Sequence, residues 1–65
     1  MPKFAELKRE FKNAGCRLIR EGSNHERWYS PITNEEFEMS RHNSEEVKPG
    51  TESALRKKAG VPKKH

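Results

Sequence analysis

Apolar residues recur at two different periods along this chain, and these periods separate helical from extended segments. Near the start, an apolar residue returns every three or four positions, as on one face of an amphipathic helix. The residues of this stripe are Phe4, Leu7, Phe11 and Ala14. Pro2 suits a helix start, and Gly15 suits the left-handed position just past a helix end. The pattern predicts a helix over residues 3–14.

The middle of the chain is divided by turn residues into short segments. A glycine, a serine and an asparagine at 22–24 form the first division, and a second turn is expected at 31–34. Between them, Trp28 and Tyr29 favour a half-buried pleated surface. After the second turn, apolar and polar residues alternate as in a strand. The pattern predicts an antiparallel meander of three strands, over residues 16–21, 25–30 and 35–40.

Residues 49–59 carry the signals of a second helix. A Pro-Gly pair opens the segment and Gly60 ends it. The apolar residues expected to face inward are Ala54, Leu55 and Ala59. We interpret residues 41–48 as a polar loop and residues 61–65 as a basic tail.

The order helix, three strands, helix predicts how these elements pack. A three-stranded sheet of this size leaves its apolar face in water unless another layer covers it. Trp28, Phe37 and Met39 cannot all point outward at a tolerable cost. We therefore expect a single α+β domain over residues 1–65, with a double-stranded-RNA-binding-like α-β-β-β-α layout. Its three-stranded antiparallel sheet carries both helices on one face, a layout that does not by itself decide function.

The composition limits the class of protein. Of 65 residues, 29% are apolar and 37% are charged, so the core must be thin. No apolar run approaches the roughly 18 residues that a membrane helix needs, and no secretory signal is readable. Cys16 is the one cysteine, so it has no internal disulfide partner and is expected as a small buried side chain. A reducing, cytoplasmic location fits best.

Charge is distributed unevenly along the chain. Residues 1–20 hold six basic and two acidic side chains, residues 21–47 hold two and seven, and residues 48–65 hold six and one. If the fold brings the two basic ends together, they form a positive face that attracts a polyanion. Solvation of a helical surface is the alternative use of these lysines and arginines. We expect the acidic segment 35–46 to lie away from any phosphate track.

His25 is the strongest candidate for chemistry. It follows Gly22, Ser23 and Asn24, a turn that would hold its side chain at a strand start while leaving it open to solvent. Imidazole titrates near neutrality, so it can take the proton of a ribose 2′-hydroxyl and let that oxygen attack the adjacent phosphorus. This reaction needs neither a metal nor a protein nucleophile. The structural alternative is a histidine that caps the hairpin or pairs with a neighbouring glutamate.

Other side chains offer weaker signals. The cysteine and the three histidines lack the short paired spacings of a zinc site, so we expect no metal and no cofactor. Glu36 and Glu38 alternate along a strand, which predicts a solvated sheet face. Backbone N–H groups at the second helix start, together with Lys48, could hold a phosphate. On charge and position, the side chains assigned to RNA are Arg20, Arg27, Lys48, Arg56, Lys57 and Lys58.

Several short motifs, taken together and in order, resemble the HicA toxin family. They are Gly22-Ser23-Asn24-His25, Glu26-Arg27-Trp28, Lys48-Pro49-Gly50-Thr51, and a closing Leu55 with Lys58-Ala59-Gly60. The resemblance implies an mRNA endoribonuclease whose activity depends on a histidine placed as His25 is here. It also implies a HicB antitoxin that covers the active site. We expect the toxin to be monomeric on its own and to form a higher-order complex with the antitoxin. Asn24 is a departure, because some relatives place histidine directly after Gly-Ser.

Three functions are therefore compatible with the sequence. The first is a metal-independent ribonuclease and toxin, which also needs an acid for the leaving oxygen; His42 or a lysine is a candidate. The second is a module that binds structured RNA through shape and phosphates without cutting it. The third is an interaction protein whose basic surface docks an acidic partner.

Overall fold

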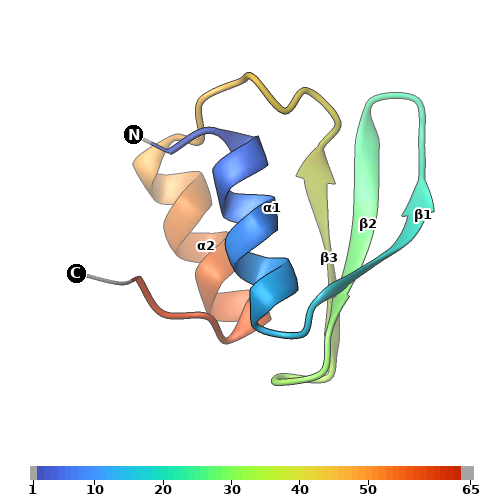
Figure 1. Ribbon diagram of the computed structural model, residues 1–65, viewed down its shortest axis with the longest axis vertical. Helices are drawn as coiled ribbons and strands as arrows, with labels where there is room; N and C mark the ends of the chain where they lie inside the picture. Colours follow the sequence, from blue (N-terminus) through green and yellow to red (C-terminus); the bar gives the residue numbers. More distant parts are fainter. Residues whose placement is uncertain (1, 64–65) are drawn as a thin grey trace.

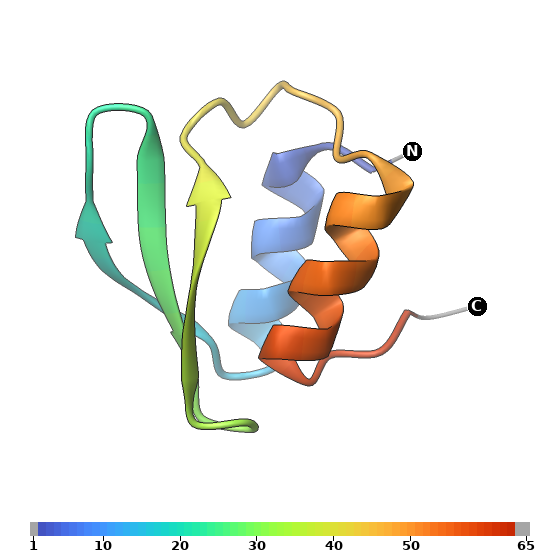
Figure 2. The same ribbon diagram turned by 180° about the vertical axis from the view of Figure 1, so that it is seen from behind.

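The computed structural model describes residues 2–63, and the chain in it forms a sheet covered by two helices (Figure 1). In order, the elements are α1 (Phe4–Asn13), β1 (Arg17–Glu21), β2 (His25–Ser30), β3 (Glu35–Ser40) and α2 (Pro49–Ala59). The strands form one antiparallel sheet in the order β1-β2-β3. Both helices lie on the same face of this sheet (Figure 2). The predicted α-β-β-β-α fold is therefore confirmed.

The ends of three predicted segments differ from the structure. Lys3 and Ala14 flank α1 as its N-cap and C-cap, and Cys16 lies in the connection before β1, buried as predicted. Val61 is also buried, so the expected basic tail begins only after it. Residues 64–65 of that tail lie outside the described part of the chain.

The loop between β3 and α2 caps the start of α1. The N–H groups in the first turn of a helix have no partner within the helix. Here the Phe4 N–H donates to the Glu45 carbonyl and the Ala5 N–H donates to the Asn43 carbonyl, both at 3.0 Å. Val47 of the same loop is fully buried in the core. The segment interpreted from sequence as a polar loop thus belongs to the packed body of the protein.

The core lies between the sheet and the helices. Phe11 of α1 meets Phe37 of β3 edge to face, with ring centroids 5.7 Å apart, and the Trp28 side chain is 1% exposed. Lys12 of α1 lies over the Trp28 ring. The side chains of Trp28, Phe37 and Met39 all point toward the helices, as the alternation predicted.

The inward face of α2 differs in one position from the predicted stripe. Leu55 and Ala59 are buried, but Ala54 is exposed. Glu52, one turn before Arg56, is buried instead, because its carboxylate accepts a hydrogen bond from the Arg56 Nε at 2.8 Å. Neither α1 nor α2 is long and apolar enough to cross a membrane, and residues 2–63 hold no other helix.

The turn between β2 and β3 is bonded to the end of α2. The Ser30 hydroxyl donates to the Ala59 carbonyl at 2.5 Å, and the Thr33 hydroxyl donates to the Lys58 carbonyl. These carbonyls lie in the last turn of the helix, where no helical partner is available. Gly60 then ends α2 in the left-handed conformation, with φ of 71°. A Cβ at this position would lie 2.7 Å from Cγ2 of Ile32.

We expect Gly60→Ala to destabilise the protein and Gly50→Ala to be harmless. The first substitution forces a left-handed alanine against Ile32, at a cost of about 2 kcal/mol in the free energy of unfolding. A Cβ at Gly50, in the first turn of α2, meets no atom within 4 Å. Urea unfolding followed by circular dichroism measures both variants. Equal midpoints for the two would contradict the packing described at Gly60.

Candidate RNA-binding site on the open face

Alternation along β2 divides its side chains between the core and the open face of the sheet. Trp28 and Ser30 are buried beneath the helices. His25, Arg27 and Tyr29 therefore point to the opposite side. Their register partners on β3 are Ser40, Glu38 and Glu36. His25 is exposed at the first position of β2, on the uncovered side of the sheet.

The predicted turn presents His25 directly. Gly22, Ser23 and Asn24 connect β1 to β2, and all three are exposed. The Gly22 N–H donates to the His25 carbonyl at 2.7 Å and closes the hairpin. A Cβ at Gly22 would lie 3.1 Å from that carbonyl oxygen, so this position has little room for a side chain.

A bulge in β1 brings Arg20 to the same face. Leu18 pairs with Trp28 and Arg20 pairs with Arg27, so Ile19 is an extra residue between two consecutive pairs. Strict alternation would place Arg20 on the same side as Leu18, toward the helices. The extra residue reverses this and sets Arg20 beside Arg27.

The residues around His25 enclose a shallow hollow of about 230 Å³. Its walls bring together the predicted base His25, the turn residues Gly22, Ser23 and Asn24, and the two arginines Arg20 and Arg27. Glu38 also lines the hollow, which corrects the expectation that the acidic segment lies away from it. The Arg27 guanidinium is 3.2 Å from the Glu36 carboxylate and 3.5 Å from that of Glu38.

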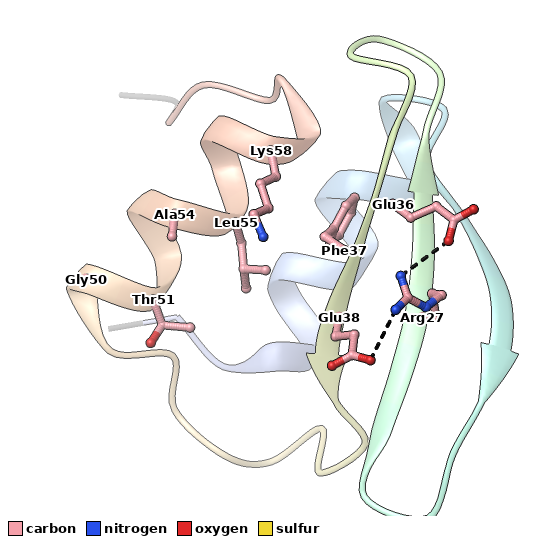
Figure 3. A pocket seen from close by; sticks show the side chains of 9 residues that line it. All are labelled: Arg27, Glu36, Phe37, Glu38, Gly50, Thr51, Ala54, Leu55 and Lys58. Atoms are coloured by element: carbon pink, nitrogen blue, oxygen red, sulfur yellow. Dashed lines mark hydrogen bonds and ion pairs between the residues drawn. The ribbon is translucent and has the colours of Figure 1, made fainter.

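A second, larger hollow of about 570 Å³ forms a groove between β3 and α2 (Figure 3). Arg27 and Glu38 line both hollows, so the two are neighbours. Lys58 extends from α2 into this groove, and Thr51 lines it from the first turn of α2 (Figure 3). Together the two hollows are lined by residues from His25, through Arg27 and Glu38, to α2.

Two other lysines assigned to RNA from the sequence lie elsewhere. Lys48 is the exposed N-cap of α2. The helix α2 begins at the same end of the molecule as the β1–β2 turn (Figure 1). Lys57 lines a different hollow, with Ser53 and Pro62. The structure thus separates Lys57 from its neighbour Lys58.

Comparison with known families gives a match over most of the chain. Residues 4–61 match the profile of the family described as the HicA toxin of bacterial toxin-antitoxin systems, from the start of α1 to just past α2. This chain belongs to the HicA toxin family. It is the toxin of a toxin–antitoxin system and has an antitoxin as its partner. Comparisons with curated proteins and with solved structures give no match.

Arg56 of this HicA toxin forms hydrogen bonds that join the two helices. The sequence had assigned it to RNA instead. Its Nη1 and Nη2 donate to the Glu10 carboxylate at 2.8 and 3.0 Å. With the Glu52 bond, these contacts leave its side chain 11% exposed. The hydrogen bonds that Arg56 donates to Glu10 raise the pKa of Arg56 above its ordinary value, so the guanidinium stays charged. Its role is to join α1 to α2.

A second ion pair lies beneath His25. The Lys8 ammonium of α1 is 2.9 Å from the Glu26 carboxylate of β2, and it donates to the Asn43 side chain at 2.6 Å. The Trp28 indole donates to the same Glu26 oxygen at 3.1 Å. These bonds tie β2 to α1 at the residue next to His25. They fix the strand from its inner side.

Metal ligands are not grouped in the described part of this toxin. Within residues 2–63, no three His, Cys, Asp or Glu side chains gather closely enough to hold an ion. The Cys16 side chain is 4% exposed and belongs to the core. The site on the open face is thus built from imidazole, guanidinium, ammonium and carboxylate groups.

Two residues near His25 were missed by the sequence analysis. Strand alternation gave a signal for Glu38, because it placed that side chain on the solvated face with Glu36. No local signal marked Arg41, whose Nη1 donates to the carbonyls of Gly22 and Ser23. These contacts join positions 18 and 19 residues apart in the sequence.

We expect the contribution of Glu26 to stability to disappear in acid. Burial raises the pKa of Glu26, but hydrogen bonds from Lys8 and Trp28 and the charges of Lys8 and Arg41 outweigh it, so the pKa falls below its ordinary value of 4.5. A lowered pKa in the folded state stabilises the protein above about pH 4.5, and this stabilisation is lost as the pH falls through the folded value.

The test compares the free energy of unfolding of Glu26→Gln with that of the unsubstituted protein from pH 7 to pH 3. The difference should be largest near neutrality and shrink below about pH 4.5. Glu45→Gln, at an exposed loop position, is the control and should change stability little throughout. A constant difference for Glu26→Gln would contradict the charged pair with Lys8.

Proposed function

We propose that this HicA toxin is a metal-independent endoribonuclease that cleaves mRNA with His25 as its general base. The observation that carries the proposal is an exposed imidazole in a hollow that also holds Arg20 and Arg27. A base beside two guanidinium groups suits a phosphodiester, which brings both a proton to remove and negative charge to bind.

The reaction requires one proton transfer at His25. The imidazole takes the proton of a ribose 2′-hydroxyl, and the freed oxygen attacks the neighbouring phosphorus. The bond from phosphorus to the 5′ oxygen of the next nucleotide breaks, which leaves a 2′,3′-cyclic phosphate and a 5′-hydroxyl. The departing oxygen takes its proton from a second acid, and no metal takes part.

Arg20 and Arg27 would bind the phosphate on which charge develops. Guanidinium groups match phosphate oxygens in a bidentate geometry. Arg27 is already paired with Glu36 and Glu38, but their carboxylates are more than half exposed. Such surface pairs contribute only about 0–1 kcal/mol, so a phosphate can replace them.

The groove between β3 and α2 would guide the RNA backbone away from His25. Lys58 reaches into it, and it joins the His25 hollow through Arg27. Lys48 extends the basic surface at the start of α2. The track that we propose leaves out Arg56, which is bonded to Glu10, and Lys57, which faces another hollow.

The antitoxin partner would be a HicB-like protein that covers this hollow. The hollow is shallow and its groups lie at the surface. A protein laid over it would exclude RNA without any change in the fold of the toxin. Inhibition by occlusion is therefore the mode that the geometry favours.

We expect His25→Ala to abolish cleavage while preserving the fold and RNA binding. Loss of a general base lowers the rate by about 100-fold or more. The assay follows a long mRNA incubated with purified toxin in the presence of a chelator, with circular dichroism as the control for folding. Undiminished cleavage by the variant would overturn the mechanism. An mRNA that the unsubstituted toxin binds but leaves intact would favour a binding module instead.

We expect Lys58→Ala to weaken RNA binding more than Lys57→Ala does. Both variants remove one lysine charge from α2, but only Lys58 lines the groove beside Arg27. Loss of one phosphate contact should reduce the slope of log affinity against log salt by about 1. Affinity for an RNA oligonucleotide is measured at several salt concentrations, in the His25→Ala background so that the RNA stays whole. Equal losses for the two variants would show that the groove is not the path.

A further inference from the structure

We propose that Arg41 is a positioning residue that holds the β1–β2 turn and so sets the direction of the His25 side chain. This inference rests on the proposed role of His25. Arg41 directly follows β3, and its Nη1 donates to the Gly22 carbonyl at 3.2 Å and to the Ser23 carbonyl at 3.1 Å. Its backbone N–H donates to the Asn24 carbonyl at 3.2 Å. Three consecutive carbonyls of the turn are therefore bound by one residue.

This clamp acts where the regular sheet stops. The last register pair between β2 and β3 is His25 with Ser40, and the turn lies beyond it. Within the turn, the Gly22 N–H bonds the His25 carbonyl. That bond closes the hairpin but does not attach the turn to β3. Arg41 provides this attachment, because it directly follows β3.

The shape of the guanidinium suits this task better than its charge alone. One nitrogen bonds two carbonyls, and Nη2 lies 3.9 Å from the Glu21 carboxylate at the end of β1. The contacts thus reach both the turn and the strand that precedes it. A lysine carries the same charge but has no planar fork of donors.

The expected consequence concerns catalysis more than folding. The Arg41 side chain is 45% exposed and is not a member of the buried hydrophobic core, so we expect its loss to leave the packed layers intact. A base that is displaced by about 1 Å from its reacting proton loses a large part of its rate. The position of the turn therefore matters to the reaction more than to stability.

The test uses Arg41→Ala, Arg41→Lys and the control Arg9→Ala. Arg9 is an exposed arginine of α1 outside the proposed RNA track, so its loss removes the same charge without touching the turn. Cleavage of a short fluorescent RNA oligonucleotide gives kcat and KM. Proton NMR of the full chain gives the exchange rate of the Gly22 amide and the ring resonances of His25.

We expect Arg41→Ala to lower kcat by about tenfold or more while KM changes little. Arg41→Lys should also lose kcat although it keeps the charge, and Arg9→Ala should match the unsubstituted toxin. The Gly22 amide should exchange faster and the His25 ring signals should shift in both Arg41 variants, but not in Arg9→Ala.

Two results would overturn the proposal. One is full activity of Arg41→Lys together with a rise in KM alone for Arg41→Ala, which would make Arg41 a phosphate contact. The other is an unchanged Gly22 amide and His25 ring in Arg41→Ala. If the unsubstituted toxin cleaves no RNA, the proposed function fails, and the NMR measurements still decide whether Arg41 holds the turn.

Discussion

The burial of Trp28 beneath α1 determines which side of β2 faces solvent. Its side chain is 1% exposed and its indole N–H is bonded to Glu26, so it cannot leave the core cheaply. Truncation of such a buried aromatic ring costs about 3–5 kcal/mol. Because side chains alternate along a strand, this burial puts His25 and Arg27 on the open face, and a slip of one residue would invert the arrangement. The exposure of His25 is thus a consequence of the core.

Two ion pairs supplement this thin core. The ion pair between Lys8 and Glu26 joins α1 to the sheet. The ion pair between Arg56 and Glu10 joins the two helices. Buried pairs add little net stability, since desolvation offsets their attraction, but removal of one partner leaves a costly unpaired charge. They therefore discriminate against other packings of the same helices. The first pair also lies next to His25 in sequence, so it fixes the inner side of the strand whose outer side carries the site.

Local patterns predicted the fold and the position of His25, because helix stripes, strand alternation and turn residues all act within a few positions. The errors arose where distant residues meet. Arg56 is bonded to Glu10, 46 positions away, and nothing near Arg56 in the sequence marks that partner. The bulge at Ile19 is likewise a property of the pairing between two strands, and strict alternation would have turned Arg20 away from His25. A charge count cannot separate a guanidinium that binds RNA from one that joins helices.

The acidic residues beside His25 give the open face a preference for polyanions, which the net charge alone does not predict. Glu36 and Glu38 both lie within ion-pair distance of the Arg27 guanidinium. A phosphate that displaces them gains a cationic partner, but it also meets two carboxylates well within the screening length of about 8 Å. A single small anion gains too little binding free energy from one such exchange to offset this repulsion. A strand of RNA presents several phosphates, and their combined contacts along the groove to Lys58 can outweigh the repulsion. The arrangement therefore favours binding of an RNA strand over binding of a single phosphate.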